Sequence, residues 1–215
     1  MLLLSYPLHS NVPVYPGTPP LKVREHQSID VDGSRSSMVE FNTHTGSHLD
    51  LPAHFHRAGE GASMLPPLLE LSPARCIEVD ADGDVPLRLR DLPNDLDGVE
   101  ALLLRTGYHN VRSNDPVRYR GEHPWLHPEA AERLRRLPNL KAVGIDTISA
   151  ASPSYPDEGT RTHLILLQPE RPVMIIEDLD LSDDELPLKE WTLYIMPLFT
   201  ADVESTPVTV LAAPL

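Results

Sequence analysis

The sequence predicts a mixed α/β fold with more strand than helix, and three observations predict it. Short apolar runs recur along the 215 residues, acidic and proline-rich turns separate them, and only one segment has a clear helical pattern. Proline occurs 23 times, about twice its usual frequency, and this favours many loops over long helices. Hydrophobic residues make up 40% and charged residues 23%, so the chain can form an ordinary globular core.

Seven apolar runs are predicted strands, because each is rich in residues that favour extended backbone and is bounded by residues that favour turns. In chain order they are 38–42, 76–80, 100–106, 141–146, 173–177, 192–196 and 208–211.

The segment 128–137 (PEAAERLRRL) is the predicted helix. Its proline lies in the first turn, its acids come early and its arginines late, which suits the helix dipole. Shorter helices are expected at 162–167 and 182–186, and the segments 12–20 and 82–98 are expected to be loops, because prolines and glycines interrupt them. No linker divides the chain, so we expect a single domain over residues 1–215.

The charge balance excludes several kinds of partner. Lys and Arg number 18 against 32 Asp and Glu, a net charge of -14 that repels nucleic acid and anionic membranes but attracts cations. Cys76 is the only cysteine, so no disulfide can form within the chain, and no apolar run is long enough to cross a bilayer. We therefore expect a cytoplasmic protein that acts on small molecules and binds neither nucleic acid nor membrane.

The most informative stretch is a cluster of histidines. Four of the ten histidines lie between positions 44 and 56, and His44, His48, Asp50 and His54 have the spacing of one face of an extended segment. Imidazole and carboxylate together suit Zn²⁺, Mn²⁺ or Fe²⁺. Two histidines and one aspartate leave coordination positions open for water, which is typical of a catalytic metal.

The alternative interpretation is a surface histidine patch that binds metal only adventitiously. The regular spacing H-x-x-x-H-x-D-x-P-x-H argues against it. His56 is expected at the surface or beside the ligands, and the remaining histidines outside the cluster are expected to be surface or packing residues: His9, His26, His109, His123 and His127.

The run 44–55 resembles the H-x-G-T-H-x-D-x-P-x-H-F signature of the metal-dependent cyclase family, which includes bacterial kynurenine formamidases and isatin hydrolases. Further segments are similar to other motifs of that family: 13–17 (PVYPG), 104–107 (LRTG), 144–147 (GIDT) and 152–154 (SPS). The resemblance implies the swivelling β/β/α fold, an α/β architecture of mixed sheets with a few flanking helices.

The resemblance also implies a complete site. His44, His48 and Asp50 would bind one metal, His163 a second, and Asp50 and Glu177 would bridge the two. Zn²⁺ is the expected metal, two per subunit, with Mn²⁺ as the alternative. His54 would transfer the proton, since its ordinary pKa near 6.5 suits that task. Tyr15 would stack on the substrate, although it could instead cap the core or an interface.

The implied activity is a metal-dependent amide hydrolase acting on an aryl formamide. The favoured reaction converts N-formylkynurenine to kynurenine and formate, a step of tryptophan catabolism. Two alternatives stay open: a hydrolase or cyclase of a cyclic amide or polyketide-like compound, and a non-catalytic metal-binding protein. The resemblance also implies a homo-oligomer, a dimer or a tetramer, with the active site near a subunit contact.

Overall fold

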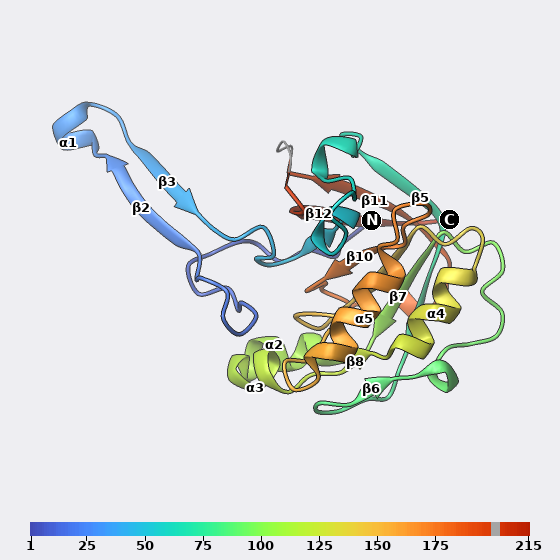
Figure 1. The fold of residues 1–215 in the computed structure, drawn as a ribbon. Coiled ribbons are helices and arrows are strands. Elements are labelled where there is room, and N and C mark those ends of the chain that lie inside the picture. The colour runs from blue at the N-terminus through green and yellow to red at the C-terminus, as the bar shows by residue number, and fades with distance from the viewer. Residues whose placement is uncertain (199–202) are drawn as a thin grey trace.

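A mixed eight-stranded sheet forms the centre of the computed structural model, which describes residues 1–198 and 203–215 (Figure 1). The strands lie in the order β1-β12-β11-β5-β7-β9-β10-β4, and β12 also pairs with β4, so the sheet curls into a barrel-like form. The bounds are β1 Leu2–Leu3, β4 His48–Asp50, β5 Leu69–Glu78, β7 Ala101–Arg105, β9 Ala142–Ile145, β10 Met174–Glu177, β11 Trp191–Pro197 and β12 Ser205–Pro214.

Four neighbouring strands, β5, β7, β9 and β10, run parallel, and β7, β9 and β10 are almost completely buried. Parallel strands are normally covered on both faces, so their sequences read as continuous apolar runs. Leu103 and Ile176 belong to the core on one side of the sheet, and Leu102 and Ile175 belong to the core on the other. This two-sided burial explains why the sequence signal was clear for β7, β9 and β10.

Few helices flank the sheet. Helix α4 (Pro128–Arg136) packs against α5 (Pro156–Leu166) over one face, and α2 (Tyr108–Asn114) and α3 (Pro116–Gly121) form a short pair nearby (Figure 1). The remaining helical pieces are single turns: α1 (Ile29–Asp32), η1 (Pro52–His54), η2 (Ala62–Met64), η3 (Leu89–Asp91) and η4 (Leu186–Leu188). The predicted mixed α/β fold with few helices is confirmed.

Two small sheets lie outside the central one. Strands β6 (Pro86–Leu87) and β8 (Trp125–Leu126) pair in parallel, and β2 (Lys22–Gln27) and β3 (Ser36–Glu40) form a hairpin. Figure 1 shows that this hairpin extends away from the rest of the chain, with α1 at its tip.

Six of the seven predicted strands and the predicted helix at 128–137 are confirmed, with small shifts at their ends. The predicted strand at 76–80 covers only the last part of β5, which begins at Leu69 and ends at Glu78. The expected helix at 162–167 is the last part of α5, which begins earlier at Pro156. The expected helix at 182–186 is wrong, because the Asp180 and Asp183 side chains accept hydrogen bonds from the backbone N–H groups of Ser182 and Glu185 and fold this segment into turns. The segment 12–20 is a loop, whereas 82–98 contains β6 and η3.

Among the helices of the described residues, none combines the length and the apolar character that crossing a membrane requires.

Gly59 allows close packing beside the turn that carries His54. A methyl group at Gly59 would lie 2.3 Å from the carbonyl carbon of Pro52 and 2.6 Å from the backbone nitrogen of Ala53. We expect Gly59→Ala to lower the free energy of unfolding by about 1–3 kcal/mol, because the backbone of η1 must move. Urea denaturation measures the change.

The matched control is Gly121→Ala, where the added methyl group meets no atom within 4 Å among the described residues. Its free energy of unfolding should stay within about 0.5 kcal/mol of the parent protein. Equal stability of the two variants would contradict the close packing at Gly59.

Candidate active site

The sequence analysis predicted that the histidine cluster lies on one face of an extended segment. The structure contradicts this prediction. Gly46 has a left-handed backbone (φ 71°), β4 spans only three residues, and Pro52 begins the η1 turn. His44 therefore precedes the strand and His54 ends the helical turn that follows it. The four side chains still gather in one place, because these turns fold the segment back on itself.

Strand pairing brings Glu177 to this cluster from a distant part of the chain. Antiparallel pairing of β4 with β10 places Glu177 opposite His48 and Ile175 opposite Asp50. His48 and Asp50 are two residues apart on β4, so both face the same side of the sheet as Glu177. His163 comes from α5, which covers this end of the sheet.

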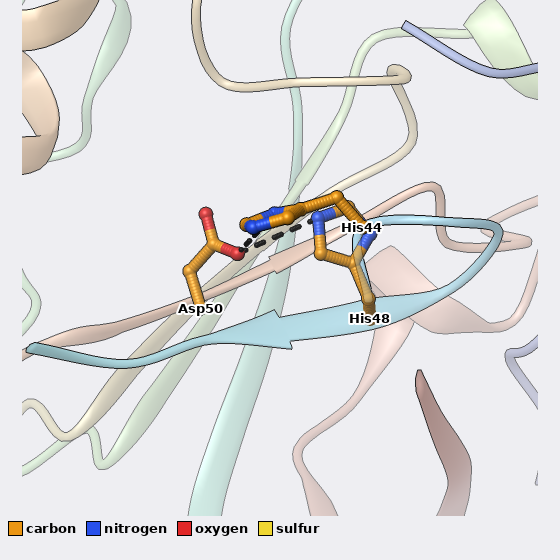
Figure 2. Close-up of side chains that lie close together, drawn as sticks. All are labelled: His44, His48 and Asp50. Carbon is orange, nitrogen blue, oxygen red and sulfur yellow. Dashed lines mark ion pairs between the residues drawn. The ribbon is translucent and has the colours of Figure 1, made fainter. Parts of the chain in front are cut away.

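The first group of potential metal ligands is His44, His48 and Asp50 (Figure 2). The Oδ1 atom of Asp50 lies 3.0 Å from His44 Nδ1 and 3.5 Å from His48 Nε2. Both imidazoles point toward the same carboxylate oxygen. A single ion could therefore contact all three side chains.

The second group is Asp50, His163 and Glu177. His163 Nε2 lies 3.6 Å from Asp50 Oδ2 and 3.4 Å from Glu177 Oε1. The other Glu177 oxygen, Oε2, lies 3.3 Å from Nε2 of His48. Asp50 thus belongs to both groups through different oxygens, and Glu177 reaches a histidine of each.

Backbone carbonyls orient two of the imidazoles. His48 Nδ1 lies 2.8 Å from the carbonyl oxygen of Gly46, and His163 Nδ1 lies 2.8 Å from that of Gly159. Because a carbonyl only accepts hydrogen bonds, these contacts place the proton on Nδ1 and leave Nε2 free to bind a metal.

Glu177 is also held by neighbours that leave it oriented toward the histidines. The Ser149 hydroxyl donates to Oε1 at 3.0 Å, and the Ala150 N–H donates to the same oxygen at 2.7 Å. The sequence analysis did not identify Ser149, although it lies two residues after the GIDT motif. The hydrogen bonds fix one carboxylate oxygen while the other stays directed at His48.

Polar atoms at the centre of the cluster lack ordinary partners. His48 Nε2 and both carboxylate oxygens of Asp50 are buried and make no well-aligned hydrogen bond with any described residue; their contacts are the ion pairs between imidazole and carboxylate given above. Buried polar groups without well-aligned hydrogen bonds are costly, whereas a divalent cation would satisfy all of them. The donor set of imidazoles and carboxylates, together with these buried atoms, fits a first-row divalent metal.

The cluster also shifts the proton affinities of its members. Burial lowers the pKa of His48 and His163, but the carboxylates of Glu177 and Asp50 outweigh it and raise the two values to about 9 and about 10. Burial raises the pKa of Glu177, yet the two histidines lower it to about 2. The pKa of Asp50 is lowered as well, against the effect of its burial, by His163 and His44.

His54 lies beside the two groups of potential ligands, but its imidazole is further from the carboxylates than those of the other histidines. Its Nε2 atom is 4.0 Å from Asp50 Oδ2, and its ring centroid is 4.3 Å from that of His44. Burial, with His44 and His163 nearby, lowers the pKa of His54, although Asp50 opposes this shift. A neutral imidazole at this place can accept a proton near neutral pH.

A cavity of about 340 Å³ opens onto the cluster. Its apolar wall is formed by Tyr15, Phe55 and Ile148, and the charged groups of the cluster line the same cavity. Burial raises the pKa of Tyr15 to about 12, so its hydroxyl stays protonated and can donate a hydrogen bond. The cavity can therefore hold a small molecule with a planar apolar part and a polar group.

Glu204 is a further residue that the sequence analysis missed. Its Oε1 lies 3.4 Å from Nε2 of His44 and accepts a hydrogen bond of 2.7 Å from the Thr43 hydroxyl. No motif marks it, because pairing of β12 with β4 brings it close from 160 positions away in sequence.

Three further histidines have partners of their own. His56, at the end of the cluster, has its Nε2 3.1 Å from the carbonyl oxygen of Leu164 on α5. His109 Nδ1 lies 3.0 Å from Asp146 Oδ2, and His123 Nδ1 lies 3.0 Å from the carbonyl oxygen of Pro124. His109 and His123 are buried, which agrees with the packing role expected for them.

Comparisons with known proteins identify the family of this chain. The model of the family described as "Putative cyclase" matches residues 2–152. A kynurenine formamidase from Bacillus cytotoxicus is 28% identical over 213 residues, covering 99% of this chain and 96% of the relative. Another from Geobacillus thermodenitrificans is 30% identical over 145 residues, covering 66% of each chain.

Solved structures share the fold at lower identity. Isatin hydrolase A from Labrenzia aggregata has a TM-score of 0.78 at 21% identity, covering 98% of this chain and 92% of its own. Isatin hydrolase A from Ralstonia solanacearum has a TM-score of 0.77 at 22% identity, covering 98% and 90%. Since the family model spans well over half of the residues, this chain belongs to the Cyclase family.

Proposed function

We propose that the chain is a metal-dependent amide hydrolase that acts on an aryl formamide. The observation that carries the proposal is the pair of ligand groups sharing Asp50, with His54 beside them at one cavity. N-formylkynurenine is the favoured substrate and would give kynurenine and formate. Curated relatives that align over nearly the whole chain are named kynurenine formamidase, which supports this choice.

The proposed ligands are those that the geometry brings together. His44, His48 and Asp50 would hold one ion, His163 a second, and Asp50 and Glu177 would bridge them. Anionic oxygens between two dications offset the repulsion between the ions. Zn²⁺ is the proposed metal and Mn²⁺ the alternative, because the donors are imidazole and carboxylate.

A divalent metal held by these residues supplies a Lewis acid, which polarises the amide carbonyl and makes water acidic enough to act as a nucleophile near neutral pH. His54 is the proposed proton-transfer residue. Its lowered pKa leaves Nε2 free to take a proton from the attacking water. As the water oxygen joins the formyl carbon and the C–N bond breaks, His54 returns that proton to the leaving amine nitrogen.

The apolar wall of the cavity is the proposed place for the aromatic part of the substrate. Tyr15 and Phe55 offer ring faces, and Ile148 offers a branched aliphatic surface. An aryl group against this wall would direct its formamide toward Asp50 and Glu177. Water would be displaced from the apolar side, which strengthens the electrostatic interactions at the reacting carbonyl.

Hydrolysis of a cyclic amide is the second candidate. Isatin hydrolases share this fold, and a cavity of about 340 Å³ can also hold a bicyclic lactam. A cyclase that acts on a polyketide-like compound is the other form of this alternative. A non-catalytic metal-binding protein is less well supported, since a purely structural metal site needs no uncoordinated imidazole such as that of His54.

We also propose that the chain forms a homo-oligomer, a dimer or a tetramer, through the β2–β3 hairpin. Val23 and Val39 are directly opposed in the register of the hairpin, and both side chains are exposed. An isolated two-stranded hairpin has little stability of its own. Its apolar face continues from a small core cluster of Val12, Val14 and Leu21 at its base, so a second copy of the chain could extend that core.

The first prediction of the proposed function concerns substrate and metal together. The purified protein should carry stoichiometric zinc or manganese and release formate from N-formylkynurenine, with activity lost to chelator and restored by the metal. Elemental analysis and a formate assay check both points, and loss of isatin by ring opening, which releases no formate, is followed separately by absorbance. Turnover of isatin alone would favour the second candidate, and activity that resists complete metal removal would contradict the site.

The second prediction separates the base from the ligands. His54→Ala should keep its metal, while turnover falls by roughly 10²- to 10⁴-fold, the usual contribution of general acid–base catalysis. His44→Ala should lose metal and activity together, because it removes a ligand. Metal content and kcat are measured side by side, and a metal-free His54→Ala protein would show that His54 is a ligand instead.

The third prediction concerns assembly. Replacing the opposed pair as Val23→Lys with Val39→Glu keeps a favourable cross-strand contact but places charge on the apolar face, so the oligomer should dissociate. Light scattering measures the mass. The control exchanges Lys22→Glu with Glu40→Lys, an opposed pair on the other face, and should leave the mass unchanged. A monomeric parent protein would refute the proposal.

A further inference from the structure

A buried ion pair lies directly behind the candidate active site. Arg112, on α2, donates from Nε to Asp178 Oδ1 and from Nη2 to Asp178 Oδ2, both at 2.7 Å. Asp178 is the residue immediately after Glu177, and both members of the pair are almost completely buried. This two-point contact fixes the orientation of the carboxylate as well as its position.

Asp178 has an unusual backbone conformation. Its φ of 55° is the only positive value of a non-glycine residue in the described part of the chain. Such a conformation costs free energy and persists only where neighbouring contacts impose it. The backbone N–H of Asp178 donates to the carbonyl of Thr147 at 2.8 Å, so the chain turns away from β10 directly after Glu177.

The same residue is tied to the second strand that carries ligands. The Ser47 hydroxyl donates to the backbone carbonyl of Asp178 at 2.6 Å, and it accepts a hydrogen bond from the N–H of Tyr6 at 3.0 Å. Ser47 directly precedes His48. The main chain of Asp178 therefore links the residue before one potential ligand to the residue that follows another.

Two tyrosines enclose the ion pair. The Tyr119 hydroxyl donates to Asp178 Oδ1 at 2.5 Å, and the Arg112 guanidinium lies 3.7 Å from the centre of the Tyr6 ring. A buried ion pair contributes little net stability, since its desolvation offsets its attraction. Fold stability alone therefore gives no account of why this pair lies here, whereas control of local geometry does.

We infer that Arg112 is a positioning residue for the metal site: through Asp178 it sets the spacing between Glu177 and His48. The inference rests on the proposed function, because that spacing matters only if the two side chains share bound metal. The Nε2 atom of His48 and Oε2 of Glu177 are 3.3 Å apart, so a small rotation at Asp178 would change how an ion fits between them. Arg112 makes its hydrogen bonds and ion pair with Asp178 and with neither proposed ligand, so it acts only through Asp178.

The test measures zinc affinity, using competition with a chromophoric chelator, on the full-length folded protein. Arg112→Met combined with Asp178→Asn removes both charges, so no unpaired charge stays buried, and asparagine tolerates the left-handed backbone. We expect zinc affinity to fall by about 10- to 100-fold, the usual effect of losing a residue that orients metal ligands. Arg112→Lys, which keeps the charge but loses the two-point contact, should recover part of that affinity.

The matched control removes a different ion pair. Arg105 donates to Glu78 Oε1 at 2.7 Å at the end of β7, away from the proposed ligands. Arg105→Met with Glu78→Gln should leave zinc affinity unchanged. Thermal unfolding of each variant, and kcat and KM measured separately at saturating zinc, show whether a loss of affinity comes from global destabilisation or from the site.

Each outcome decides the inference. A folded double variant with the zinc affinity of the parent overturns the positioning role and leaves the proposed function intact. A parent protein that binds no zinc overturns both. If the double variant does not fold, Arg112→Lys decides: reduced affinity at an unchanged melting temperature supports the role, and unchanged affinity overturns it.

Discussion

Two carboxylates that face the same enclosed space are the constraint on which the rest of this structure depends. Asp50 and Glu177 are 1% and 4% exposed, and each raises the cost of ionising the other. Buried negative charges of this kind persist only beside positive charges or metal ions. The three imidazoles of His44, His48 and His163 surround them and form the immediate environment of both groups.

The fold delivers these groups through rigid elements. Strand β4 contributes His48 and Asp50, its partner β10 contributes Glu177, and α5 contributes His163. His44 is the exception, because it precedes β4 in a turn. Side chains held on strands and helices keep a geometry that loops could not maintain, which a metal site with several ligands requires.

The residues of the candidate ligand groups and the aromatic residues of the cavity come from different kinds of element. His48, Asp50, Glu177 and His163 lie on the sheet and on α5, whereas Tyr15 comes from an N-terminal loop and Phe55 follows the η1 turn. Loop residues can change without moving side chains that are held on strands and helices. The residues around Glu177 also form two sets. Ser149 and Ala150 donate hydrogen bonds to its carboxylate, and the next residue, Asp178, pairs with Arg112.

The sequence by itself determined most of the strands and the first group of potential metal ligands, because both leave local signals. Parallel strands buried on two faces read as apolar runs, and His44, His48 and Asp50 lie within seven residues of one another. His163 and Glu177 were identified only through family resemblance, since neither has a local pattern. Glu204, Ser149 and the Arg112–Asp178 pair were decided by tertiary structure alone, because strand pairing and helix packing join residues that are 28 to 160 positions apart. A sequence pattern records which residues share a face, whereas contacts between distant elements depend on how those faces meet.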